Sequence, residues 1–424
     1  MASTHIVILG AGFAGIEVAR GLGKAGLSVT LVDRQNHHLF QPLLYQVATA
    51  ALSPADIAEP VRKMLRGQDS VEVMLDEVSG IDTAGRSVSL ASGRTLRYDI
   101  LVVATGATHS YFGHDEWADF APGLKTIADA RQIRSRLLLA FEEAEMSEDV
   151  AEQKRLMTIA VVGGGPTGVE LAGSIAELAC YALSKDFHRI RAETATVLLL
   201  EAGTRILAAF PDDLASYATT KLTKLGVTVR TRCVVENVTA DGVTANGETI
   251  GAGLVIWAAG VRASRMGAML GVPVDRAGRV TVATDLSVTG LDGVYALGDI
   301  ALCPDANGKP LPGLAQVAKQ QGEYLGKALA KKITKGTQPA PFRFQNRGNT
   351  AIIGRHAAVF DFGWWRLKGW FAWSFWALIH VYLLVGFQHR LMVAIQWLWR
   401  YVTYERGSRL IAEEIHPPHN RTAA

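Results

Sequence analysis

The same order of apolar and small residues occurs twice along the chain. Ile6–Leu9 is a short apolar run, and it is followed by a glycine-rich turn, a helical pattern over 16–21 and a second apolar run over 27–32. The order returns at Thr158–Val162, which precedes another glycine-rich turn, a helical pattern and the apolar run Val197–Leu200. Short apolar runs bounded by glycine indicate buried strands, and alternation with helices indicates a parallel sheet. The pattern therefore predicts an α/β fold with two similar domains.

The two glycine turns have the chemistry of dinucleotide sites. Both follow the pattern G-x-G-x-x-G, which begins at Gly10 in the first domain and at Gly163 in the second. Such a turn lets the backbone approach a pyrophosphate, and the following helix offers free N–H groups and a positive dipole. Since a lone glycine motif is weak support, the strand, helix and terminal acid in register carry the prediction.

An acid ends the second strand of each domain, at Asp33 and at Glu201. A carboxylate at this place can bind a ribose diol, and it repels a 2′-phosphate. Glu201 therefore favours NADH over NADPH, although Arg205 lies close enough in sequence to weaken that preference. Glu201 also lies farther from its glycine motif than the roughly 20 residues that are usual. An insertion over 180–194 accounts for the excess.

Three further apolar runs end in small residues. They are Ile100–Gly106, Leu254–Gly260 and Val294–Asp299. Small residues at strand ends allow close approach of backbone to a cofactor. Together with the glycine turns, these runs resemble the two-dinucleotide-binding-domain flavoproteins over about residues 5 to 330. The resemblance implies non-covalent FAD at the first motif, a nicotinamide cofactor at the second, and a role for Asp299 at the ribityl chain.

Three segments narrow the resemblance to the type II NADH:quinone oxidoreductases. Asn36–Ala48 looks like that family's flavin-side segment, Leu314–Gln321 looks like its quinone-site motif, and the aromatic C-terminal region looks like its membrane anchor. The resemblance implies two Rossmann-like domains of the glutathione reductase type and a C-terminal helical anchor. It also implies that NADH reduces the flavin, that NAD⁺ leaves, and that a membrane quinone (ubiquinone or menaquinone) accepts the electrons without proton pumping.

The resemblance extends to individual positions. Glu170 is the candidate for proton or hydride handling, although an acid in the first helical turn is also favoured by the dipole alone. Gln316 is the second catalytic candidate, and Gln316, Gln320 and His380 are candidates for quinone binding; a polar helix surface and a satisfied buried histidine are the plainer alternatives. The FAD-binding candidates are Gly10, Gly12, Phe13, Ala14, Gly15, Asp33, Arg34, His38, Pro42, Leu43, Val78, Ala104, Thr105, Gly106, Gly298, Asp299 and Ala315. The candidates for NADH are Gly163, Gly165, Pro166, Thr167, Gly168, Glu201, Ala259 and Gly260.

The cysteines decide between related enzyme classes. The chain has three, Cys180, Cys233 and Cys303, and none lies close to another in sequence. Thiol reductases and sulfide:quinone oxidoreductases need cysteines beside the flavin, so both are disfavoured. Soluble ferredoxin or rubredoxin reductases need none and stay the main alternative. No group of residues has metal-ligand spacing, so no metal is expected.

The C-terminal region differs in composition from the rest. Seven of the nine tryptophans lie between Trp364 and Trp399, and Gly369–Gln388 carries no formal charge. Tryptophan prefers the headgroup zone, and basic residues favour anionic lipid. We therefore expect helices that lie in the interface over 369–404. A spanning helix and a buried dimer contact are the alternatives.

The complete prediction is a flavoenzyme on the cytoplasmic face of the inner membrane. With 424 residues and a net charge of +3, the chain is long enough for two domains and too weakly basic to suggest nucleic acid. No basic region with an apolar core precedes the first strand, so no signal peptide is expected. The predicted division is 1–115 and 285–341 for FAD, 116–284 for NADH with a charged helical connector, and 342–424 for the anchor. A homodimer is expected.

Overall fold

The computed structural model describes residues 4–305, 307–384, 387–403 and 406–411. Its contacts divide the chain into two compact units. Unit 1 comprises 1–39, 58–110 and 261–347, and unit 2 comprises 40–57, 111–260 and 348–424. These limits differ from the predicted division, chiefly because 40–57 and the C-terminal region belong to unit 2. The predicted assignment of segments to cofactors stays a prediction.

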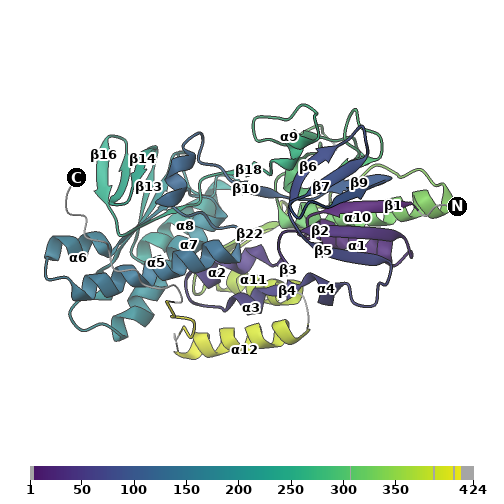
Figure 1. Cartoon of the computed structure of the whole chain (residues 1–424). Coiled ribbons are helices and arrows are strands. Elements are labelled where there is room, and N and C mark those ends of the chain that lie inside the picture. Colours follow the sequence, from purple (N-terminus) through teal and green to yellow (C-terminus); the bar gives the residue numbers. More distant parts are fainter. Residues whose placement is uncertain (1–3, 306, 385–386, 404–405, 412–424) are drawn as a thin grey trace, which may run out of the picture. The chain divides into compact units, whose positions relative to one another are not determined.

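Unit 1 is built on a parallel sheet with the strand order β20-β9-β1-β2-β5. The strands are β1 (His5–Leu9), β2 (Ser28–Asp33), β5 (Val71–Leu75), β9 (Ile100–Val103) and β20 (Val294–Ala296). Helices α1 (Gly15–Gly23) and α10 (Ala315–Lys335) lie side by side against this sheet (Figure 1). Ile6, Leu9 and Leu101 are fully buried, because strands covered on their faces need apolar side chains on both sides.

Smaller elements surround that sheet in unit 1. An antiparallel meander is formed by β6 (Val78–Asp82), β7 (Ser87–Leu90) and β8 (Thr95–Arg97). Short strand pairs are β3 (His37–Leu39) with β4 (Ala58–Pro60), β10 (Ala107–His109) with β18 (Val261–Ala263), and β19 (Val280–Thr281) with β21 (Ala301–Leu302). The short helices are α4 (Val61–Met64), α9 (Met266–Met269) and the 3₁₀ turn η6 (Gly298–Ile300).

Unit 2 repeats the parallel arrangement with the order β13-β12-β11-β17. These strands are β11 (Thr158–Val162), β12 (Thr196–Glu201), β13 (Val227–Thr231) and β17 (Leu254–Trp257). Beside them is the meander β14 (Val235–Thr239), β15 (Gly242–Ala245) and β16 (Glu248–Gly251). The longer helices are α5 (Ile127–Met146), α6 (Val150–Leu156), α7 (Pro166–Glu177) and α8 (Asp212–Lys224).

The predicted helical connector, residues 129–154, is formed by two helices, α5 and α6. Thr126 begins α5 with a capping box, in which its hydroxyl accepts from the Asp129 N–H and the Asp129 carboxylate accepts from the Thr126 N–H. The predicted insertion over 180–194 contains short helical turns, η3 (Leu178–Ala182), η4 (Leu183–Lys185) and η5 (Ala192–Thr194). Unit 2 also has the turns η1 (Gln41–Leu43) and η2 (Asp115–Asp119) and the short helices α2 (Leu44–Ala48) and α3 (Pro54–Ile57).

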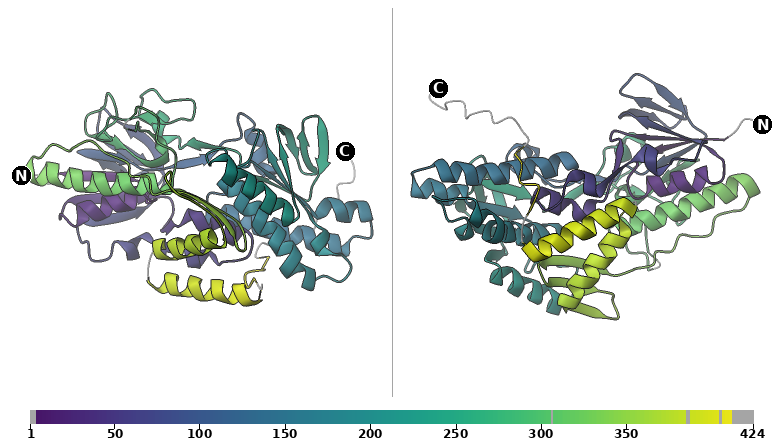
Figure 2. Two further views of the ribbon diagram at one scale, coloured as in Figure 1. Left: turned by 180° about the vertical axis from the view of Figure 1, so that it is seen from behind. Right: turned by 90° about the horizontal axis from the view of Figure 1, so that it is seen from below.

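The C-terminal region of unit 2 is a three-stranded hairpin sheet followed by two helices. The elements are β22 (Asn349–Gly354), β23 (Ala357–Asp361), β24 (Arg366–Gly369), α11 (Trp370–Leu383) and α12 (Phe387–Thr403). Strand β22 packs on α7, and α11 packs on β23 and on α12 (Figure 2). Within the described residues, no helix is both long and apolar enough to cross a membrane.

Candidate functional site

The first glycine turn is packed tightly against the end of β9. Gly10 has φ +98°, and a Cβ there would lie 2.6 Å from the Ala104 carbonyl oxygen. A Cβ at Gly12, by contrast, would meet nothing within 4 Å, so the turn is open on its outer side. Glycine is therefore required at Gly10 by backbone conformation and close approach. The open side at Gly12 suits a pyrophosphate.

Asp33 supports the same turn with both carboxylate oxygens. Oδ2 accepts from the Ala11 N–H at 2.6 Å, and Oδ1 accepts from the Gln35 N–H at 2.7 Å. His38 lies behind the turn, where its Nδ1 is 3.0 Å from the Ala11 carbonyl oxygen and its ring meets Phe13 edge-on. Burial lowers the pKa of His38, so it is neutral at pH 7. These contacts with Ala11 and Phe13 hold His38 against the turn.

The remaining FAD candidates of unit 1 lie at neighbouring strand ends. Asp299 is in η6, next to Gly313, whose Cβ would lie 3.2 Å from Oδ1. The Thr105 hydroxyl is 2.5 Å from that of Ser264. The FAD candidates that belong to unit 1 lie in or next to its strands and helices. They are Gly10, Gly12, Phe13, Ala14, Gly15, Asp33, Arg34, His38, Val78, Ala104, Thr105, Gly106, Gly298, Asp299 and Ala315. Pro42 and Leu43 are in η1 of unit 2.

Sequence reasoning missed Gln321. This residue is only 1% exposed, and its Oε1 accepts from the Gly298 N–H at 2.7 Å, beside Asp299. A signal was available, because Gln321 shares the helical stripe of Val317 and Leu325, where an apolar residue is expected. A polar residue at such a position must have a partner.

The second glycine turn repeats the geometry of the first. Gly163 has φ +108°, and its Cβ would lie 2.6 Å from the Ala258 carbonyl, whereas Gly165 has open space. Glu201 Oε2 accepts from the Gly164 N–H and Oε1 accepts from the Gly203 N–H, each at 2.6 Å. The acid thus has the same two supports as Asp33, and its remaining lone pairs are available for a ribose diol.

Arg205 is occupied away from this acid. Its guanidinium donates to the carbonyls of Ala208 and Phe210 and pairs with Asp212 at 2.9 Å. These contacts hold the Arg205 guanidinium against Ala208, Phe210 and Asp212, and none of them involves Glu201. Pro166 and Thr167 form the exposed first turn of α7, and Ala259 and Gly260 follow β17.

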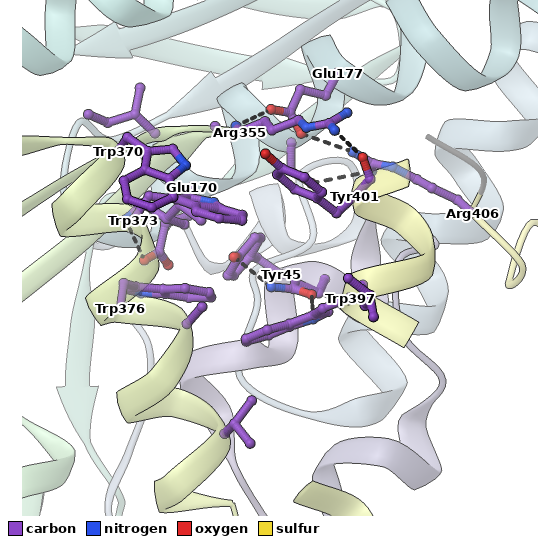
Figure 3. Close-up of a pocket in the computed structure, with 18 of the residues that line it drawn as sticks. Tyr45, Glu170, Glu177, Arg355, Trp370, Trp373, Trp376, Trp397, Tyr401 and Arg406 are labelled. Atoms are coloured by element: carbon purple, nitrogen blue, oxygen red, sulfur yellow. Dashed lines mark hydrogen bonds and ion pairs between the residues drawn. The ribbon is translucent and has the colours of Figure 1, made fainter. Parts of the chain in front are cut away.

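Unit 2 contains a cavity of about 600 Å³ that aromatic rings surround (Figure 3). Trp376 and Trp397 stack at 5.3 Å, and the Trp397 indole N–H donates to Gln46 Oε1 at 3.0 Å. Other lining residues come from α2, α7, η3, β22, the turn between β22 and β23, α11, α12 and the segment after α12: Tyr45, Glu170, Ser174, Glu177, Tyr181, Ile352, Ile353, Gly354, Arg355, Trp370, Trp373, Ala377, Leu378, Val381, Ala394, Leu398, Tyr401 and Arg406.

Glu170 lines this cavity one turn beyond the start of α7. Its Oε1 accepts from the Ile352 N–H at 3.5 Å. Burial raises the pKa of Glu170 to about 8, and the Ile352 N–H opposes this increase only weakly. A carboxyl with this pKa carries a proton at neutral pH.

A buried ion pair closes another part of the cavity wall. Arg406 is 4% exposed at its side chain and lies 3.6 Å from Glu177, and it donates to the Thr49 carbonyl at 2.7 Å. The guanidinium of Arg355 lies 4.5 Å from the centre of the Tyr401 ring, and the Arg355 N–H donates to Glu177 (Figure 3). Sequence reasoning missed these residues, because their pairing joins distant segments.

The three quinone candidates do not meet in one compact unit. Gln316 and Gln320 lie on one face of α10 in unit 1, as their spacing predicted, and they bond to the backbone of Arg347 and Gln345. His380 is in unit 2, with Nδ1 2.8 Å from the Trp376 carbonyl oxygen. Burial lowers the pKa of His380 to about 4, so it is neutral at pH 7. Its ring stacks on Trp376, one of the residues that line the cavity.

The three cysteines are free, and burial raises the pKa of each thiol. Protonated thiols are poor nucleophiles, so they do not suit disulfide reduction. Among the described residues, no group of three or more His, Cys, Asp or Glu side chains could hold a metal ion.

Comparison with known proteins identifies the family. Residues 4–322 match the pyridine nucleotide-disulphide oxidoreductase family. The chain is 40% identical, over 97% of its length and 90% of theirs, to two proteins of Mycobacterium tuberculosis that are named type II NADH:quinone oxidoreductases Ndh and NdhA. The chain belongs to the type II NADH:quinone oxidoreductases. The family that the sequence motifs predicted is thereby confirmed, in preference to soluble ferredoxin or rubredoxin reductases.

Solved structures agree with this type II family at the level of the fold. A structure of NDH2 from Plasmodium falciparum in complex with NADH has a TM-score of 0.89 at 22% identity, and it covers 97% of this chain and 100% of that one. The sulfide:quinone oxidoreductase of Aquifex aeolicus has a TM-score of 0.71 at 17% identity, over 92% of each chain. The predicted α/β fold with dinucleotide-binding domains is confirmed.

Proposed function

We propose that this protein oxidises NADH and reduces a membrane quinone, with non-covalent FAD as its redox group. One observation carries the proposal. Helix α7 begins at the second glycine turn, and its next turn presents Glu170, which is protonated at pH 7, to an aromatic cavity. A nucleotide site and a proton donor beside an apolar cavity thus lie on one helix, as a reductase of an apolar quinone requires.

The residues of unit 1 fit FAD. The open side at Gly12 accepts the pyrophosphate, Asp33 is in place for a ribose diol, and Asp299 for the ribityl chain. The start of α1 adds N–H donors and a positive dipole beside the phosphates. Bound FAD supplies two-electron redox chemistry that side chains lack. The two supporting amides keep the Asp33 carboxylate fixed, so little entropy is lost when the diol binds.

The residues of unit 2 fit NADH in the corresponding manner. Glu201, fixed by the Gly164 and Gly203 amides, accepts from the adenosine ribose hydroxyls. Pro166 and Thr167 leave the start of α7 exposed to the pyrophosphate. A carboxylate at this point disfavours a 2′-phosphate, so we propose NADH as the preferred donor.

The aromatic cavity fits the ring of a quinone. Planar rings such as Trp376 and Trp397 stack well on another planar ring, and the cavity falls in the size range of ligand sites. Reduction of a quinone to a quinol takes up two electrons and two protons. The hydride taken from NADH accounts for both electrons and one of the two hydrogens. Glu170 supplies the remaining proton and regains it from water. Gln316, Gln320 and His380 remain candidates for contacts to the quinone.

The C-terminal helices have an exposed apolar surface. Phe371, Leu378 and Tyr382 of α11 are 71%, 67% and 70% exposed, and Leu398 of α12 is 65% exposed. Such side chains with tryptophans and basic residues suit the interface of an anionic bilayer. We propose a monotopic attachment on the cytoplasmic face of the inner membrane. A homodimer is proposed as well, as for the predicted family.

Turnover with a long-chain quinone in lipid vesicles tests the proposal. We expect one quinol for each NADH oxidised, with FAD recovered from the purified protein. Ferredoxin and disulfides should be poor acceptors in the same assay. Reduction of ferredoxin at a higher rate than quinone, or protein that binds no FAD, would overturn it.

A further inference from the structure

The turn that follows β13 has an unusual backbone beside Glu201. Arg232 has φ +52°, in the left-handed region that a long side chain rarely adopts. Its N–H donates to the Gly203 carbonyl at 2.8 Å, and the next N–H, of Cys233, donates to the Glu201 carbonyl at 2.9 Å. Arg232 is therefore tied to the segment whose acid receives the ribose.

Asn246 holds this conformation from the opposite side. Its Nδ2 donates to the Arg232 carbonyl at 2.8 Å, and its Oδ1 accepts from the Val234 N–H at 2.9 Å. A left-handed backbone is unfavourable for a non-glycine residue and persists only where surrounding bonds fix it. Such local strain is a reason to look for a function of the side chain it presents.

The guanidinium of Arg232 differs from those of its neighbours. Arg230 is paired with Glu248 at 2.8 Å, and Arg205 with Asp212 at 2.9 Å. Arg232 is exposed, and none of the described residues forms an ion pair or side-chain hydrogen bond with it. An exposed arginine without an ion pair among the described residues thus follows Thr231, whose backbone pairs with that of Glu201.

We propose that Arg232 binds the 2′-phosphate of NADPH and so gives this site a secondary capacity for the phosphorylated nucleotide. The inference rests on the proposed nucleotide site in unit 2. A guanidinium matches a phosphate with paired N–H donors. Glu201 repels that phosphate and Arg232 attracts it, so the preference for NADH is smaller than the acid alone would set.

Binding of NAD⁺ and NADP⁺ to the flavin-loaded enzyme tests this assignment by titration calorimetry. Arg232→Gln should weaken NADP⁺ binding by roughly five- to tenfold, as expected for a charge-assisted contact, and should change NAD⁺ binding less than about twofold. Glu201→Gln should strengthen NADP⁺ binding, and adding Arg232→Gln should remove most of that gain. Higher salt should reduce the Arg232 effect.

Arg230→Gln is the matched control, because it removes one positive charge two residues away, at a position in β13. It should leave the ratio of the two dissociation constants unchanged. Equal weakening of both nucleotides by Arg232→Gln, or no effect on NADP⁺, would overturn the role of Arg232 while leaving the nucleotide site intact. A wild-type enzyme that binds neither nucleotide would overturn the proposed function itself.

Discussion

Replacing Glu170 by glutamine tests whether the cavity holds a protonated acid. Burial raises the pKa of Glu170 from 4.5 to about 8. Between these values the folded protein keeps a proton that the unfolded chain releases, so the free energy of unfolding falls as pH rises. Between about pH 5 and pH 8 the loss amounts to about 3 to 4 kcal/mol, at 1.36 kcal/mol for each pKa unit.

Chemical unfolding of the flavin-loaded enzyme at several pH values measures this pH-dependent loss in the free energy of unfolding. The wild type should lose stability over that window relative to Glu170→Gln, whose side chain has the same shape and no charge. Glu142→Gln, at an exposed position of α5, is the control and should follow the wild type. Parallel pH profiles for wild type and Glu170→Gln would refute the raised pKa.

The rates of the two half-reactions show whether Glu170 acts as a general acid or has only a structural role. General acid catalysis contributes about 10²- to 10⁴-fold, so Glu170→Gln should slow reoxidation by quinone by a factor in that range. Reduction by NADH should change little. The wild-type quinone step should also slow as pH rises above about 8, where Glu170 loses its proton, and this dependence should be absent from Glu170→Gln.

Further substitutions address the other sites. Gln316→Ala should slow reoxidation by quinone more than reduction by NADH in stopped-flow traces, and equal losses would make Gln316 a general positioning residue. Asp33→Asn should weaken FAD binding about tenfold or more, since it removes charge-assisted bonds, and the flavin content of purified protein measures this. Replacing Phe371 and Leu378 by serine should release the enzyme from vesicles in flotation, whereas high salt alone should not; unchanged flotation would exclude this surface as the anchor.

Local patterns predicted the two glycine turns well, because their determinants are close in sequence. Gly10 and Gly163 each need a left-handed backbone just after a strand. In each unit an acid, Asp33 or Glu201, ends the strand that pairs with that first strand. The helical spacing of Gln316 and Gln320 likewise placed them on one face. These features depend on one strand–turn–helix unit each.

Features that join distant segments could not be predicted in the same manner. Arg406 meets Glu177 and Thr49, and Trp397 meets Gln46, although no spacing relates these residues. The positions of the C-terminal tryptophans likewise could not be predicted from local sequence. Composition marked them as interfacial, but Trp376 is 2% exposed and stacks inside the cavity, so one aromatic segment supplies both its lining and an exposed surface.

Anaerobic spectroscopy of the purified enzyme tests the central claim most directly. One equivalent of NADH should bleach the flavin absorbance, and one equivalent of quinone should restore it. A flavin that NADH does not bleach, or that quinone fails to restore, would contradict it.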